Sequence, residues 1–126
     1  MTQRRNISSG SKWEPLLGYS RAVVAGNTVY VSGTVGAAAD GSVPEGAYAQ
    51  SKRALEIIRD ALAQAGADLT HVVRTRLFLT DMADFDAVAK AHGEAFGEIR
   101  PATTIVKVAG LVDAAFVVEI EAVAVI

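Results

Sequence analysis

Alternating apolar and polar positions, together with runs of β-branched residues, predict five β-strands along the chain. They cover residues 22–25, 28–32, 72–79, 102–108 and 116–126. Gly26-Asn27 separates the first two and predicts a tight hairpin turn, because both residues adopt the positive φ angles that such turns require. In the last strand, the even-numbered residues from Phe116 to Ala124 form one apolar face, whereas Glu119 and Glu121 lie among valines on the other.

A helical period of apolar residues predicts two helices. The first covers about 45–65, where Pro44 suits the first turn and Gly66 suits the C-terminal cap. Its expected buried stripe is Leu55, Ile58, Leu62 and Ala65. The second helix follows Asp81, the expected N-cap, and Pro101 limits it. Its expected buried stripe is Phe85, Val88, His92 and Phe96.

The order strand, strand, helix, strand, helix, strand, strand predicts an α+β domain with a single mixed sheet and two helices on one face. In the strand over 72–79, strict alternation assigns Val73, Thr75, Leu77 and Leu79 to one face, and Val72, Arg74, Arg76 and Phe78 to the other. The second face of the sheet still carries valine and phenylalanine beside its charges. We therefore expect other subunits to bury it.

Composition narrows the class of protein. The 126 residues fit one domain, 1–126, and 51% hydrophobic against 21% charged residues favours a subunit interface. A net charge of −2 with dispersed lysine and arginine argues against a nucleic-acid partner. With no cysteine and two histidines, neither a metal site nor a cofactor is expected. No apolar run suggests a signal peptide or a membrane span, so the cytoplasm is the expected location.

Short matches in a fixed order extend over nearly the whole chain. They are Gly18-Tyr19, Gly26-Asn27, Ser32-Gly33, Gln50, Ala65-Gly66, the segment from Val72 to Asp81, Asp84-Phe85, Pro101-Ala102 and Glu119-Ile120-Glu121-Ala122. In this order and spacing, the chain resembles the RidA/YjgF family, also called the reactive intermediate deaminase or L-PSP family. The resemblance implies a chorismate-mutase-like fold and a homotrimer whose sheets form a central barrel, with ligand clefts between subunits.

The resemblance also implies chemistry, namely hydrolysis of the C=N bond in small imines or enamines, with no cofactor and no metal. Glu119 matches the family's catalytic acid, and a carboxylate in a partly apolar interface would have a raised pKa. The implied substrate-binding residues are Tyr19, Ser32, Gly33, Thr103 and Ile105. Tyr19 would offer a hydroxyl and a ring face, and Gly33 would let a ligand approach the main chain.

One position departs from the family pattern. In deaminating members an arginine after Pro-Ala binds the substrate carboxylate, and here that position is Thr103, which cannot neutralise a carboxylate. Arg76, Arg100 and Lys107 are alternative cations, but their spacing along the strands makes none a convincing replacement. We therefore expect an altered, non-carboxylate substrate preference. The alternative is a non-catalytic trimer that binds a small molecule or has a regulatory role.

Other interpretations of the same residues stay open at this stage. Glu119 or Glu121 could be a structural ion-pair partner of Arg74 or Arg76. His92 is expected to be a hydrogen-bonded core or interface residue rather than a base. The older family name suggests a ribonuclease, but an acidic protein without a pair of histidines suited to phosphoryl transfer argues against it.

Overall fold

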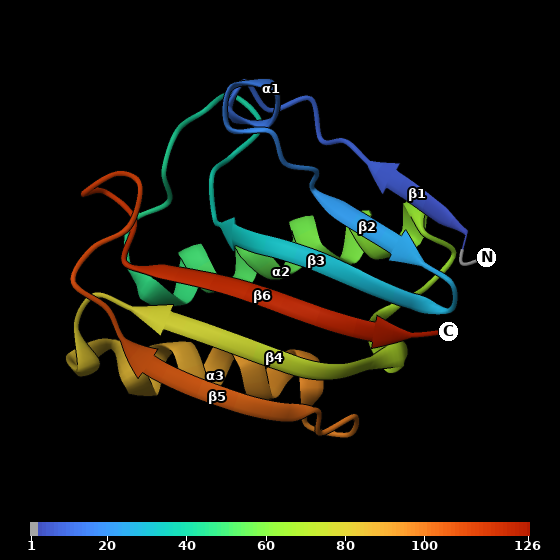
Figure 1. Cartoon of the computed structure of the whole chain (residues 1–126). Coiled ribbons are helices and arrows are strands. Elements are labelled where there is room, and N and C mark those ends of the chain that lie inside the picture. The colour runs from blue at the N-terminus through green and yellow to red at the C-terminus, as the bar shows by residue number, and fades with distance from the viewer. Residues whose placement is uncertain (1–2) are drawn as a thin grey trace.

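The computed structural model describes residues 3–126 and contains one six-stranded sheet (Figure 1). Its strands are β1 (Arg4–Ile7), β2 (Ala22–Ala25), β3 (Thr28–Val35), β4 (Val72–Leu79), β5 (Ala102–Lys107) and β6 (Val118–Val125). The spatial order is β1-β2-β3-β6-β4-β5, and only β4 and β5 pair in parallel. The prediction of a mixed sheet is thus confirmed, and the last strand of the chain lies at its centre.

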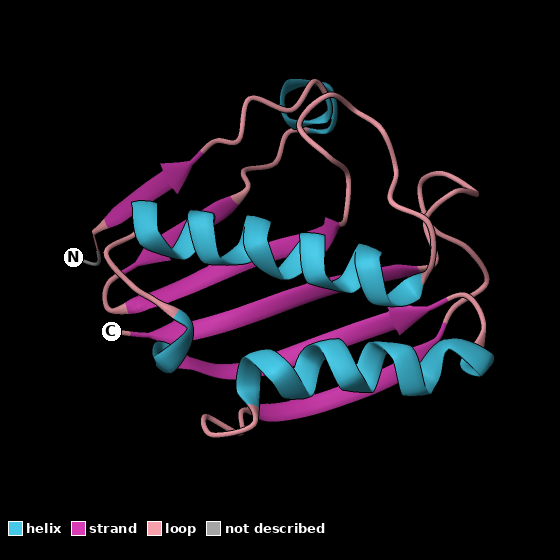
Figure 2. Cartoon of the chain, turned by 180° about the vertical axis from the view of Figure 1, so that it is seen from behind, coloured by secondary structure: helices cyan, strands magenta, loops and turns pink. Residues whose placement is uncertain are grey.

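Two helices, α2 (Ala47–Gln64) and α3 (Phe85–Phe96), cover one face of the sheet, as predicted (Figure 2). The predicted stripe of α2 is buried, with Ile58 and Leu62 fully so. The side of the sheet that faces the helices is also apolar, and Leu77, Leu79, Val118 and Ile120 of β4 and β6 are fully buried there. Burial of this apolar area is the main stabilising contribution to a domain of this kind.

Gly66 ends α2 as predicted, with a φ of +81°. Its N–H bonds to the carbonyl of Ala63, and the N–H of Ala67 bonds to the carbonyl of Leu62, so the last carbonyls of the helix have partners. The start differs slightly from the prediction, because Gly46 has a φ of +92° and cannot continue the helix. The helix therefore begins at Ala47, and Pro44 precedes it.

Two details of the sequence pattern were wrong. A bulge between Val72 and Arg74 interrupts the pairing of β4 with β6, so Val72 is 3% exposed and Val73 is 47% exposed, the reverse of strict alternation. Phe85, expected in the stripe of α3, is 42% exposed. A 3-10 turn, η2 (Met82–Asp84), precedes α3, and Asp81 caps it by accepting from the N–H of Ala83. Phe85 is thereby left at the edge of the helix, pointing outward.

The N-terminal elements β1 and α1 (Trp13–Leu17) were not predicted. In β1 only Ile7 is buried, so the strand has no apolar pattern. Helix α1 has five residues and is stabilised by its buried Glu14, which accepts hydrogen bonds from the N–H groups of Ser9 and Ser11. Burial alone would raise the pKa of Glu14, but the hydrogen bonds, mainly from Ser9, outweigh it and lower the pKa.

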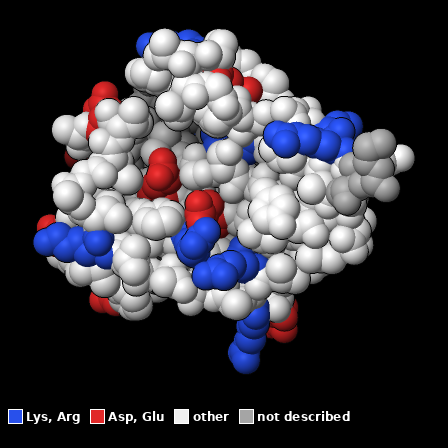
Figure 3. Space-filling model, viewed as in Figure 1, with Lys and Arg blue, Asp and Glu red and all other residues white. Residues whose placement is uncertain are grey.

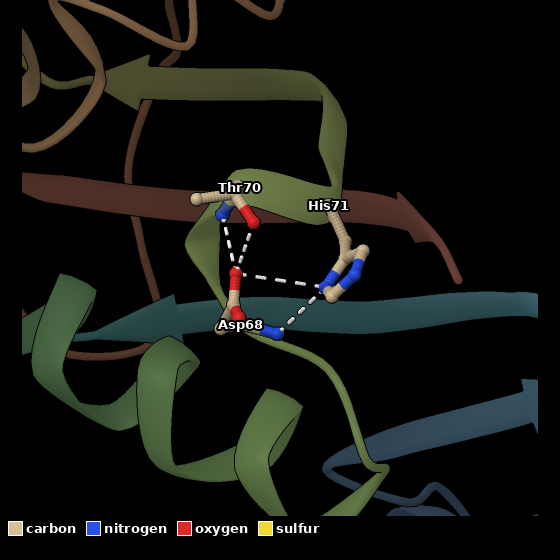
Figure 4. A network of polar contacts seen from close by, with 3 residues as sticks. All are labelled: Asp68, Thr70 and His71. Atoms are coloured by element: carbon tan, nitrogen blue, oxygen red, sulfur yellow. Dashed lines mark hydrogen bonds and ion pairs between the residues drawn. The ribbon is translucent and has the colours of Figure 1, made fainter.

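His71 ends the 3-10 turn η1 (Leu69–His71) and takes part in a local capping network (Figure 4). The Asp68 carboxylate accepts from the N–H of Thr70 at 2.8 Å and from its hydroxyl, while the Nδ1 atom of His71 accepts from the N–H of Asp68 at 3.0 Å. Hydrogen bonds from Thr70 lower the pKa of Asp68. These contacts give His71 a structural role at the entry to β4.

The other face of the sheet, seen in Figure 3, is largely uncharged, with a few acidic and basic side chains near its middle. Tyr30, Val106 and Val125 are exposed on it. Arg76 of β4 forms an ion pair there with Glu121 of β6. Between residues 3 and 126, no helix has the length and apolar character needed to cross a membrane.

Candidate functional site

A cavity of about 810 Å³ opens between α1, the end of β3, the start of β6 and helix α2. Four of the predicted site residues line it together: Tyr19, Ser32, Gly33 and Glu119. Apolar side chains complete the wall, including Trp13, Leu17, Ile57, Val112 and Phe116. A smaller cavity of about 250 Å³ lies on the open sheet face between Tyr30, Arg74, Arg76 and Glu121, and Ser32 borders both.

A β-bulge shapes the wall of the larger cavity. In the pairing of β3 with β6, Val31 faces Ala122 and Thr34 faces Ile120, so two residues, Ser32 and Gly33, stand where one would be expected. The Ser32 hydroxyl donates to the carbonyl of Ser20 at 2.7 Å, and its N–H donates to the carbonyl of Arg21 at 3.0 Å. Bulges re-aim strand residues, and this one is fixed by the segment that follows Tyr19.

Gly33 permits the close approach of Glu119. A Cβ atom on Gly33 would lie 2.9 Å from Cδ and 3.0 Å from Oε2 of the Glu119 side chain, closer than real contacts allow. Glycine is therefore required at this point of the strand if the carboxylate is to keep its position. Gly33 and Glu119 act as a structural unit in the cavity wall.

Glu119 is half-buried, and among residues 3–126 its side chain has no hydrogen-bond or ion-pair partner. Burial raises the pKa of Glu119, the nearby Arg21 opposes the rise, and Glu121 adds to it. The ion pair considered for Glu119 forms at Glu121 instead, with Arg76. An unpaired carboxyl with a raised pKa, in the wall of a cavity, is suited to taking up a proton and giving it back.

Arg21 is the residue that sequence reasoning missed. It follows Tyr19-Ser20 at the start of β2, lines the same cavity, and is 9% exposed. Its Nη2 atom donates to the carbonyl of Gly33 at 2.6 Å, and its Cζ atom lies 5.9 Å from the centre of the Tyr19 ring. An arginine at the start of an apolar strand was the available signal, because a buried guanidinium needs partners.

Thr103 and Ile105 do not lie in this cavity within one chain. Both are on β5, at the opposite edge of the sheet from β1, and Ile105 packs against the helix side of the core. The Thr103 hydroxyl lies 2.8 Å from the Thr75 hydroxyl and donates to the carbonyl of Pro101 at 3.0 Å. Thr75 in turn lies 2.9 Å from Nε2 of His92.

His92 is half-buried and hydrogen-bonded to Thr75, as expected, and burial lowers its pKa. Two of the cations considered as substitutes for the missing arginine are engaged elsewhere. Arg76 pairs with Glu121, and Arg100 donates from Nε to the carbonyl of Gly97. Lys107 ends β5 opposite Leu79. Within the described part of the chain, no cluster of three potential metal ligands occurs.

Gln50 of α2 fixes the segment that leads to Glu119. Its amide nitrogen donates to the carbonyls of Pro44 and Ala115, both at 3.0 Å, and its amide oxygen accepts from the N–H of Val117 at 2.9 Å. Gly36 allows this packing, since a Cβ there would lie 2.2 Å from the carbonyl oxygen of Gln50. The helix, the end of β3 and the start of β6 are thereby held together around the cavity.

Comparison with known proteins finds one family match and relatives that cover most of the chain. The family described as Endoribonuclease L-PSP matches residues 10–126. The chain is 39% identical over 124 residues to the 2-iminobutanoate/2-iminopropanoate deaminase of Capra hircus, covering 96% of this chain and 90% of that protein. An uncharacterized protein of Streptomyces coelicolor is 41% identical over 118 residues, covering 93% and 88%.

Solved structures agree with these relatives. A member of the YjgF/YER057c/UK114 family from Mycobacterium tuberculosis superposes with a TM-score of 0.92 at 44% identity, covering 98% of this chain and 100% of that one. RidA from an Antarctic Psychrobacter gives a TM-score of 0.83 at 34% identity, with 96% and 94% covered.

Proposed function

This chain belongs to the Endoribonuclease L-PSP family, which includes YjgF and RidA proteins, and we propose that it hydrolyses the C=N bond of small reactive imines or enamines. The observation that supports this best is the unpaired, half-buried Glu119 in the wall of a cavity that also contains Tyr19, Ser32 and Gly33. Relatives 36 to 39% identical are named for this type of reaction, as 2-iminobutanoate/2-iminopropanoate deaminases.

The proposed chemistry places few demands on the protein, because imines already hydrolyse in water. The oxygen of a water molecule bonds to the imine carbon while the carboxylate of Glu119 accepts a proton from that water. The C=N π bond breaks as the imine nitrogen takes that proton from Glu119, which gives a carbinolamine. Glu119 then transfers the proton of the carbinolamine hydroxyl to the nitrogen while the C–N bond breaks, and a carbonyl compound and ammonia leave. A positioned proton relay of this kind contributes about 10²- to 10⁴-fold. Tyr19 and the main chain at Gly33 would orient the ligand.

We further propose that the protein is a homotrimer, in which the sheets form a central barrel and the cavity becomes a cleft between subunits. The exposed Tyr30, Val106 and Val125 on the helix-free face support this, because an apolar sheet face needs cover. In the trimer, the partner subunit's Thr103 and the partner subunit's Ile105 would complete the cleft. Light scattering should give about three times the 13.2 kDa chain mass. A monomer at micromolar concentration would contradict the assembly.

Thr103 in place of an arginine supports a non-carboxylate substrate preference. Its hydroxyl already has partners in Thr75 and Pro101, and it carries no charge. Loss of one charge-assisted contact should lower kcat/KM on carboxylate-bearing imines by at least roughly 10- to 100-fold. Thr103→Arg should recover part of the lost kcat/KM. The preference would be contradicted if the wild-type protein already hydrolysed carboxylate-bearing imines efficiently and Thr103→Arg brought no improvement.

A non-catalytic ligand-binding or regulatory trimer is the alternative function, and the lack of a cation at position 103 favours it. Ammonia release separates the two functions. Imines generated by an amine oxidase should release ammonia faster with the wild-type protein than in buffer. Glu119→Gln should remove most of that acceleration while retaining the oligomer. Binding of the carbonyl product with no acceleration by the wild-type protein would support the alternative.

A further inference from the structure

Arg21 is a buried cation whose hydrogen-bonding capacity is only partly used. Nη2 bonds to the carbonyl of Gly33, and Nε is covered by protein and has no partner. Nη1 also has no hydrogen-bond partner in the part of the chain that the structure describes, but unlike Nε it is not fully covered. Because Arg21 lines the larger cavity, Nη1 is the donor that a ligand in the cavity can reach. A donor of a charged group that faces a cavity and has no protein partner can form a charge-assisted hydrogen bond with a ligand atom.

We propose that Arg21 determines substrate class at this site, by donating one hydrogen bond from Nη1 to a neutral carbonyl oxygen next to the reacting C=N group. This proposal rests on the proposed function. It narrows the substrates to compounds in which the C=N group stands next to an uncharged carbonyl, such as that of an amide or a lactam. The donor is separate from Thr103, since Arg21 directly precedes β2 and lines the same cavity of one chain as Glu119.

The geometry favours one neutral acceptor over a carboxylate. A guanidinium binds a carboxylate most strongly through two parallel N–H···O bonds from two nitrogens. Here the carbonyl of Gly33 holds Nη2 and protein atoms cover Nε, so neither nitrogen is available to form such a fork with Nη1. The accessible part of Arg21 therefore matches a single oxygen atom.

The charges around the cavity favour the same class of ligand. Two cations, Arg21 and Arg53, and two carboxylates, Asp60 and Glu119, line it, so its formal charge is zero. Arg53 is engaged by the carbonyl of Ala37 at 2.9 Å and by the carboxylate of Glu56 at 3.3 Å. An anionic ligand near Arg21 would also approach Glu119, which flanks the same Gly33 residue. A neutral acceptor avoids that repulsion.

The test uses carbonyl products as probes, so it needs no turnover. Calorimetry on the oligomer as purified would compare pyruvamide, which offers a neutral amide oxygen, with pyruvate and with butanone. We expect the wild-type protein to bind pyruvamide most tightly. Arg21→Met should weaken pyruvamide binding by about 10- to 100-fold and bring it to the level of butanone. Arg59→Met removes the same charge at an exposed arginine of α2 that does not line the cavity, and it should leave the order of affinities unchanged.

Other outcomes overturn the proposal. Pyruvamide binding that is absent, or unchanged in Arg21→Met, would show that Arg21 has only a structural role. Tighter binding of pyruvate that depends on Arg21 would make the residue an anion site. If Arg21→Met does not fold, the wild-type protein alone still tests the proposal, because equal affinities for pyruvamide and butanone would overturn it. Arg21-dependent pyruvamide binding without imine hydrolysis would refute the proposed function alone.

Discussion

Replacing Gly33 by alanine should displace the Glu119 carboxylate with little change to the fold. The new Cβ atom would lie 2.9 Å from Cδ of Glu119, whereas ordinary contact begins at 3.4 Å, so the carboxyl must retreat by at least about 0.5 Å. The atoms that move are the far end of a flexible side chain, so the free energy of unfolding should change little. Gly33 itself does not have a positive φ, so alanine brings no backbone strain.

The expected effect on catalysis is larger. A misplacement of about 1 Å in a catalytic arrangement costs on the order of 10²-fold, so a shift of about half that predicts a decrease in kcat of roughly 10-fold or more. Ammonia release from an oxidase-generated imine measures the rate, and thermal unfolding measures stability. Together they distinguish a displaced carboxylate from a damaged fold.

Gly93→Ala is the matched control. It lies within α3, no atom beyond its chain neighbours and the nearby helix backbone is within 4 Å of its added Cβ, and alanine favours a helix by about 1 kcal/mol over glycine. It should keep wild-type turnover with equal or higher Tm. Wild-type turnover in Gly33→Ala would refute the claim that close contact between Gly33 and Glu119 positions the reactive group.

Four further outcomes are expected. Burial raises the pKa of Glu119, so the folded protein binds this proton more tightly than the unfolded chain, and stability should fall as pH rises from about 4.3 through the raised pKa. Glu119→Gln removes that loss, so its Tm should exceed that of wild type at neutral pH, and a lower Tm would indicate a structural ion pair. Turnover, in contrast, should fall with decreasing pH through the same pKa as the base is protonated, and a rate independent of pH would exclude this role. Gln50→Leu should lower the free energy of unfolding by roughly 1–3 kcal/mol, because Val117, Pro44 and Ala115 lose their partners, and denaturant titration measures it.

The sequence predicted the parts of the fold whose residues repeat with a clear period. Helix α2 and strand β6 have long apolar repeats and strong end signals such as Gly66, so their positions and buried faces agree with the structure. Strand β1 and helix α1 are four and five residues long, too short for a period to show, and polar contacts such as those of Glu14 stabilise α1. The bulge at Val72 depends on pairing between distant strands, which strict alternation does not contain.

The candidate site also has a part that the sequence predicted and a part that depends on contacts in the folded chain. Family resemblance pointed to Tyr19, Ser32, Gly33 and Glu119, and these lie around one cavity because the chain returns to the same end of the sheet. Arg21 carries no periodic signal, since its importance comes from burial beside Gly33 and Tyr19. Thr103 lies on β5 at the far edge of the sheet, so the fold of one chain does not bring it to the cavity that Tyr19 and Glu119 line.

Ammonia release by the wild-type protein and by Glu119→Gln, measured side by side on an imine of an uncharged carbonyl compound, tests the central claim most directly. The account predicts clear acceleration by the wild-type oligomer. It also predicts a rate about 10²- to 10⁴-fold lower for the variant, with an unchanged oligomeric mass. Equal rates for the two proteins, or no acceleration by either, would contradict the claim that the Glu119 carboxylate in this cavity catalyses C=N hydrolysis.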